Sequence, residues 1–189
     1  PAKADFAMVF IKSPVSNGYS KADREAGGNG YVPISLQLKD YTAVDARAQS
    51  IAAGDPVVDP TITNRSYLNK TSKSNSYPDL NTILDTKKAM NGKPVLVAVT
   101  VSNPMVFGEF EKDVDAIVGE FGVQTEALLD IVSGHVEPSG LLPLQMPKDM
   151  TTVEKQLEDV PHDMIPYQDA NGNVYDFGFG LNWKGVIKD

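Results

Sequence analysis

Two carboxylates that could do acid–base chemistry, Asp23 and Glu25, lie two residues apart in a long polar segment. This segment covers residues 15–31 (VSNGYSKADREAGGNGY) and shows no apolar periodicity. Loops of this length are uncommon in compact domains unless they have a function. The glycines that follow would let Glu25 reach a neighbouring cleft, where apolar surroundings or a second carboxylate would raise its pKa and make it a general acid. On composition alone, the alternative is a solvated loop carboxylate.

Other conventional sites lack the residues that their chemistry requires. The cluster Gly27–Gly30 has neither the spacing nor the preceding strand of a dinucleotide-binding loop or a P-loop. The stretch from Asp169 lacks the Gly and Glu that a calcium loop needs, so we expect a β-turn at 169–173. His135 and His162 are isolated, and the chain has no cysteine. The sequence therefore predicts neither a metal site nor a cofactor.

Bulk composition narrows the class of partner. The chain has 189 residues, which is the size of one domain, and 41% of them are hydrophobic. Its formal net charge of −8 would repel nucleic acid phosphates. No apolar run approaches the roughly 18 residues of a membrane span. We therefore expect neither nucleic acid nor a membrane as a partner.

The elements that must position the acidic segment alternate between strand and helix. An apolar strand is predicted at 6–11, directly before the segment, and a β-branched central strand at 95–101. Residues 102–107 follow that strand at its carboxyl end, where α/β sheets gather ligands. Further strands or extended pieces are predicted at 33–38, 116–121, 141–146 and 174–183, and helices at 43–53, 79–90 and 125–132. Residues 55–78 form a polar insertion that could hold a short hairpin, and 151–166 are expected to be irregular.

Three stretches carry a resemblance to a known family. They are Val132–Pro147 (VSGHVEPSGLLPLQMP), Phe177–Trp183 (FGFGLNW), and the pair Ser102-Asn103-Pro104 with Asp115–Val118. In this order they resemble the C-terminal domain of glycoside hydrolase family 3, the family of β-glucosidases and exo-glucanases. The spacing holds over about residues 93–183 and more loosely over 4–53.

The resemblance implies a fold and a partner. The fold belongs to the α/β class. It is a three-layer α/β/α sandwich with a mainly parallel sheet of about six strands, formed by the single domain 1–189. In the family this domain packs on an N-terminal (β/α)8 barrel of the same polypeptide, which carries the nucleophile and has no equivalent in this chain. No signal peptide opens the sequence. The compartment is therefore unknown, and a secreted or periplasmic enzyme whose signal region precedes this segment is one expectation.

The resemblance also implies a reaction, the hydrolysis of terminal β-D-glucosyl residues from oligosaccharides by a retaining mechanism. Glu25-Ala-Gly-Gly-Asn-Gly, followed by Ile34-Ser-Leu, resembles the acid/base loop of the exo-glucanase branch, which makes Glu25 the acid/base candidate and Asp23 the alternative. A competing alignment places Asn17 at that position, and Asn cannot donate the proton.

Tyr19, Arg24 and Tyr31 are the candidate substrate-binding residues, and Tyr67 could also stack on a sugar ring. The isolated domain is expected to be inactive because the nucleophile lies elsewhere. The alternative function is a non-catalytic interaction or carbohydrate-binding domain that buttresses the barrel. A nucleotide-binding domain is a third reading, suggested by architecture only.

Overall fold

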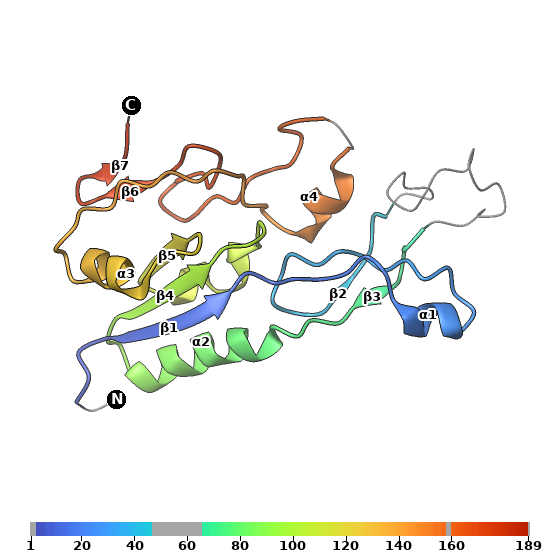
Figure 1. Ribbon diagram of the computed structural model, residues 1–189, viewed down its shortest axis with the longest axis horizontal. Helices are drawn as coiled ribbons and strands as arrows, with labels where there is room; N and C mark the ends of the chain where they lie inside the picture. The colour runs from blue at the N-terminus through green and yellow to red at the C-terminus, as the bar shows by residue number, and fades with distance from the viewer. Residues whose placement is uncertain (1–2, 47–65, 158–159, 189) are drawn as a thin grey trace.

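A three-stranded parallel sheet lies at the centre of the chain in the computed structural model, which describes residues 3–46, 66–157 and 160–188 (Figure 1). Its strands are β1 (Ala7–Lys12), β4 (Val95–Thr100) and β5 (Ala116–Glu120), in the order β1-β4-β5. The central strand β4 is rich in valine because neighbours cover it on both faces. Val95, Val97 and Val99 are fully buried on one face, and Ala98 is buried on the other. The predicted strands at 6–11, 95–101 and 116–121 are thus confirmed.

Helix α2 (Tyr77–Met90) connects the first two strands of the sheet and packs against both. Pro78 is accommodated in the first turn, where a missing N–H costs nothing, so the helix begins two residues before the predicted start. Asn91, in the left-handed conformation with φ 48°, ends it. Leu80 and Ile83 are buried against the sheet.

Two short 3-10 turns and a helix flank strand β5. The turns, η2 (Phe107–Glu109) and η3 (Glu111–Asp113), bury Phe107 and Phe110 in the main core, with ring centroids 5.8 Å apart. Helix α3 (Thr125–Val132) has the predicted bounds. No helix in the described ranges is long and apolar enough to cross a membrane.

The C-terminal third differs from the prediction. Residues 141–146 and 174–183 do not join the parallel sheet. Their backbones bond to each other instead, from Leu142 N to the Phe179 carbonyl (2.8 Å) and from Met146 N to the Tyr175 carbonyl (2.9 Å). Pro143 and Pro147 remove donors that a ladder would need. Among the described residues of this region, the only strands are the two-residue β6 (Leu181–Asn182) and β7 (Gly185–Val186), which form a separate hairpin.

Part of the segment 151–166, which was expected to be irregular, is helical. Asp149 caps the start of helix α4 (Met150–Lys155), because its carboxylate accepts the N–H of Thr152 at 2.9 Å. The β-turn predicted at 169–173 is confirmed, since Gly172 N donates to the Asp169 carbonyl at 3.1 Å. The α/β class with a parallel sheet is therefore confirmed, but the sheet has three strands in the described residues rather than about six.

A strand of a small second sheet lies directly before the segment predicted to be helical from residue 43. Strand β2 (Tyr41–Thr42) pairs with β3 (Thr71–Ser72) in antiparallel register. Residues 43–46 are not helical, and the rest of that predicted helix, 47–53, lies outside the described residues. Of the predicted insertion 55–78, residues 55–65 lie outside them as well, and β3 pairs with β2 rather than within the insertion. Residues 33–38 form no strand.

Candidate functional site

Residues 16–32, which we call the arm, leave the carboxyl end of β1 and project beyond the ends of the strands (Figure 1). The two limbs of the arm bond to each other. Ser20 N donates to the Gly30 carbonyl at 2.8 Å, and Val32 N donates to the Gly18 carbonyl at 3.1 Å. Helix α1 (Lys21–Glu25) closes the tip. The arm is thus a hairpin that carries both predicted carboxylates on one turn of helix.

Ser13 fixes the root of the arm. Its buried hydroxyl accepts the N–H of Ser102 at 2.9 Å and the N–H of Asn103 at 3.1 Å, which joins the carboxyl ends of β1 and β4. The segment 102–107, where chemistry was expected, therefore forms a structural junction. Met105 and Phe107 in that segment belong to the core.

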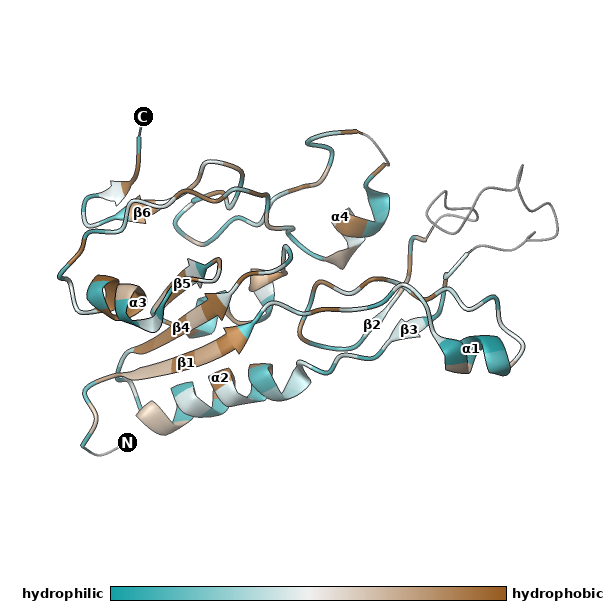
Figure 2. Ribbon diagram, in the orientation of Figure 1, coloured by the Kyte–Doolittle hydropathy of each residue, from teal (hydrophilic) through white to brown (hydrophobic). Residues whose placement is uncertain are grey.

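Helix α1 is held by polar contacts. Ser20 caps its start by accepting the N–H of Asp23 at 3.2 Å. The helix buries none of its residues, and Figure 2 shows it as one of the most hydrophilic parts of the chain. Its position therefore depends on hydrogen bonds and charge more than on core packing.

Asp23 faces inward and is the centre of these contacts. Its carboxylate accepts the N–H of Gly30 at 2.8 Å and pairs with the Lys70 ammonium at 2.6 Å. The hydrogen bond from Lys70 is the largest cause that lowers the pKa of Asp23. Gly28 permits this arrangement, because a Cβ there would lie 2.3 Å from Asp23 Oδ2. Asp23 is thus a bound, ionised anchor.

Lys70 lies in residues 66–78, the part of the predicted insertion that the structure describes, and its side chain reaches the arm. Besides Asp23, its ammonium donates to Asn29 Oδ1. The side chain of Asn29 in turn donates to the Ser66 carbonyl at 2.9 Å, and its Oδ1 accepts the N–H of Tyr31 at 3.0 Å. We call Asp23, Asn29 and Lys70 the clamp. The sequence analysis did not identify Asn29 or Lys70, because no local pattern relates residues 41 and 47 positions apart.

Glu25 faces the other way. It is the last residue of α1, its side chain is 65% exposed, and its ion pair is a 3.3 Å contact with Lys21, whose side chain is 83% exposed. Arg24 is exposed beside it. The structure therefore places the two carboxylates on one element in opposite environments.

The candidate sugar-binding tyrosines divide into two groups. Tyr19 and Tyr31 face each other across the arm as an antiparallel bridge, and the ring of Tyr19 lies against Gly30 with 55% of the residue exposed. Tyr31 is half-buried. Tyr67 packs against a separate core cluster that contains Tyr41, so its ring takes part in packing. Asn17, the residue of the competing alignment, is exposed near the root of the arm.

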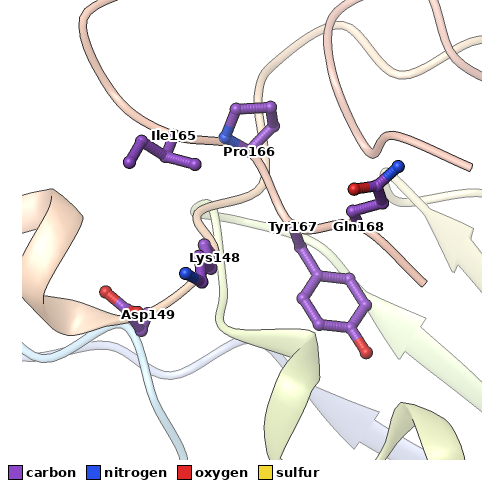
Figure 3. A pocket seen from close by; sticks show the side chains of 6 residues that line it. All are labelled: Lys148, Asp149, Ile165, Pro166, Tyr167 and Gln168. Carbon is purple, nitrogen blue, oxygen red and sulfur yellow. The ribbon is translucent and has the colours of Figure 1, made fainter. Parts of the chain in front are cut away.

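A shallow hollow elsewhere contains none of the predicted site residues (Figure 3). It is lined by Lys148, Asp149 and the segment 165–168. Asp149 is occupied as the cap of α4, and Tyr167 donates its hydroxyl to Glu111 at 2.9 Å. Within the described part of the chain, no group of three or more His, Asp or Glu side chains is placed to hold a metal ion. The arm is therefore the best candidate site.

The chain resembles proteins whose names describe glycosidases. Over 104 residues it is 35% identical to "Probable beta-glucosidase C" of Aspergillus flavus, an alignment that covers 52% of this chain and 16% of that protein. It is 28% identical over 107 residues to "Periplasmic beta-glucosidase/beta-xylosidase" of Dickeya chrysanthemi, an alignment that covers 57% of this chain and 15% of that protein. It is 24% identical over 206 residues to "Periplasmic beta-glucosidase" of Salmonella typhimurium, an alignment that covers 93% of this chain and 27% of that protein.

The chain thus spans between about a seventh and about a quarter of the length of these relatives. The sequence model of one family, described as "Glycosyl hydrolase family 3 C-terminal domain", matches residues 1–183, which is nearly the whole chain. This match includes residues 93–183, where the motif stretches carry the resemblance, and it extends to residue 1. The chain therefore belongs to the C-terminal domain family of glycoside hydrolase family 3.

Proposed function

We propose that this domain supplies the acid/base residue, Glu25, to a retaining β-glycosidase whose nucleophile lies on an N-terminal (β/α)8 barrel of the same polypeptide. We call that polypeptide the parent enzyme. The observation that carries the proposal is the contrast within α1, where Asp23 is fixed inward and Glu25 is 65% exposed beyond the sheet. An acid that must serve a site on another domain has to be presented in this way.

Glu25 is a better proton donor than Asp23 for a physical reason. The Lys70 ammonium, at 2.6 Å, lowers the pKa of Asp23 and so keeps that carboxyl group ionised. Donation by Asp23 would also require it to release Lys70 and Gly30. Glu25 has only an exposed contact with Lys21 to give up, and surface ion pairs of this kind contribute little.

The chemistry then takes two steps. In the first, the carboxylate of the barrel attacks the anomeric carbon while Glu25 donates its proton to the leaving oxygen, which breaks the glycosidic bond. In the second, the Glu25 carboxylate removes a proton from a water molecule that displaces the enzyme carboxylate. Retention requires the two carboxyl groups to lie about 5–5.5 Å apart, so the arm must dock over the barrel site.

Exposed apolar side chains around the arm support such docking. Val15 at its root, Tyr19 on one limb and Ile34 just beyond the other are each more than half exposed. Their burial against the barrel would exclude water from the reacting groups. Tyr19 could then stack on a sugar ring, with Arg24 and Tyr31 as further substrate contacts. We propose a β-linked glucosyl oligosaccharide as the substrate class, because the similar proteins are named beta-glucosidases.

The test replaces Glu25 by Ala in the parent enzyme and compares aryl β-glucosides with poor and activated leaving groups. Only a poor leaving group needs its oxygen protonated. We therefore expect kcat/KM to fall by roughly 10²–10⁴-fold for poor leaving groups and far less for activated ones. The exposed Glu137→Ala variant is the matched control and should have no effect. Equal, mild losses for both substrates would favour a non-catalytic, buttressing domain. The isolated domain should not turn over either substrate.

A further inference from the structure

We propose that Lys70 is a positioning residue for Glu25, which it orients through Asp23 and Asn29 from a segment of the chain more than 40 residues away. The inference deepens the proposed function and rests on it, because it assigns Lys70 a role in the acid/base step. It concerns residues that lie outside the three motif stretches of the family and that only the folded structure brings together.

Helical geometry links Lys70 to Glu25 although the two residues do not touch. At 3.6 residues per turn, side chains two positions apart are related by a rotation of about 200° about the helix axis, so they point to nearly opposite sides of the helix. When Asp23 is held inward, Glu25 must therefore face outward. The clamp thus sets the direction in which Glu25 points.

The clamp joins the tip of the arm to its second limb. Asp23 belongs to helix α1 at the tip and Asn29 to the second limb, and the Lys70 ammonium bonds to both side chains. The side chains of Asp23 and Lys70 are only 23% and 22% exposed, so water screens their attraction less than that of the surface pairs. Lys70 also keeps the pKa of Asp23 low, so the clamp stays charged while Glu25 gains and loses its proton.

Lys70 itself is held by the second sheet. Its N–H donates to the Tyr67 carbonyl at 3.0 Å, and its carbonyl accepts the N–H of Ala43 at 3.0 Å. The next residue begins β3, which pairs with β2. The ammonium therefore projects from a fixed backbone, whereas α1 buries no residue of its own. A positioning role follows, since little besides these polar contacts defines where α1 lies.

The experiment compares Lys70→Met, Lys70→Arg and Lys73→Met in the parent enzyme. Lys73 is a matched control, because it lies just past β3 and pairs with Asp40, with its own side chain 80% exposed. We expect Lys70→Met to lower kcat/KM about tenfold or more for poor leaving groups, because a misplaced Glu25 would lose part of its acid/base contribution. For activated leaving groups the loss should be less than about threefold, because their departure does not need protonation. Lys70→Arg should restore most of the loss, and Lys73→Met should change neither rate. The rate on the activated substrate shows that the variant is folded.

Amide hydrogen exchange on the arm gives a second readout that needs no substrate. In Lys70→Met the amides of Ser20 and Gly30 should exchange about tenfold faster or more, and in Lys73→Met they should not change. If Glu25→Ala depends on the leaving group and Lys70→Met does not, the positioning role is overturned and the proposed function stands. If Glu25→Ala shows no such dependence while exchange rises in Lys70→Met, the proposed function fails and the clamp is only structural. Unchanged exchange in Lys70→Met would overturn the clamp itself.

Discussion

Replacing Gly28 by Ala should loosen the arm without affecting the rest of the fold. Gly28 does not have a positive φ, so the change adds no backbone strain. A Cβ at this position would, however, lie 2.3 Å from Asp23 Oδ2 and less than 3 Å from the other atoms of the carboxylate. The carboxylate must then move away from the N–H of Gly30 or from Lys70. The arm should consequently open more readily.

The size of the effect follows from the contacts that are lost. A hydrogen bond to a charged group contributes about 1.5–3 kcal/mol, so the loss of one contact should favour opening of the arm by about that free energy. This corresponds to roughly 10- to 150-fold faster amide exchange at Gly30. Hydrogen exchange with mass spectrometry or NMR on the domain measures this directly.

Gly18→Ala is the matched control for Gly28→Ala. Gly18 lies on the same arm and also lacks a positive φ, and a Cβ there would meet Ile34 at an ordinary 3.7 Å. It should leave the exchange rate of Gly30 within about threefold of the wild type. The reasoning would be refuted by an unchanged rate in Gly28→Ala, or by an equal increase in both variants, since any added methyl group would then loosen the arm.

Three further predictions concern the scaffold. Ile83→Ala, at a fully buried position of α2, should lower the free energy of unfolding by about 2–5 kcal/mol in urea titrations. Leu84 is partly exposed, so Leu84→Ala should lower it by less than about 1 kcal/mol. Equal losses in the two variants would show that Ile83 does not belong to the core. Ser13→Ala should cost about 1–3 kcal/mol, because it removes the acceptor of two backbone N–H groups, and an unchanged urea midpoint would contradict that role. Lys87 lowers the pKa of Asp115, so this carboxylate stabilises the fold at neutral pH and its contribution is lost as the pH falls below the usual aspartate range. Urea midpoints at several pH values should therefore show a weaker acid dependence in Asp115→Asn than in the wild type, and an identical dependence would count against the pairing.

The strands of the sheet could be predicted where the local sequence pattern agrees with the burial that the fold imposes. The run from Val95 to Val101 has no charge and is β-branched, which suits a strand covered on both faces, and the structure buries it accordingly. Helix α3 was predictable for the same reason, since its sequence has helical periodicity and Ser133-Gly134 follows it. In these segments local preference and tertiary context agree.

The parts that were not predictable depend on partners far along the chain. The alanine-rich segment from residue 43 resembled a helix, but Glu154, about 110 residues later, accepts the N–H groups of Val44 and Asp45. Ala43 and Ala46 are buried in a small cluster with Met150. No sequence window contains both sides of these contacts.

The candidate site also has a part that could be predicted from the sequence and a part that could not. A polar, glycine-rich segment after a strand indicated an exposed segment with carboxylates, and Glu25 is exposed at the end of the short helix that lies within it. The inward role of Asp23 was not visible in the sequence, because it depends on Lys70 and on the absence of a Cβ at Gly28. The sequence thus predicted which residues are on the arm, and the fold adds the direction in which each one points.

The most direct test of the central claim is azide rescue of Glu25→Ala in the parent enzyme, with an activated aryl β-glucoside as substrate. Removing the acid/base residue leaves room for a small anion beside the glycosyl-enzyme, and azide attacks without needing a base. The account predicts faster turnover in azide and a glucosyl azide product of β configuration. No acceleration, or a product of α configuration, would contradict it, because Glu25 would then be either outside the reaction or the nucleophile itself.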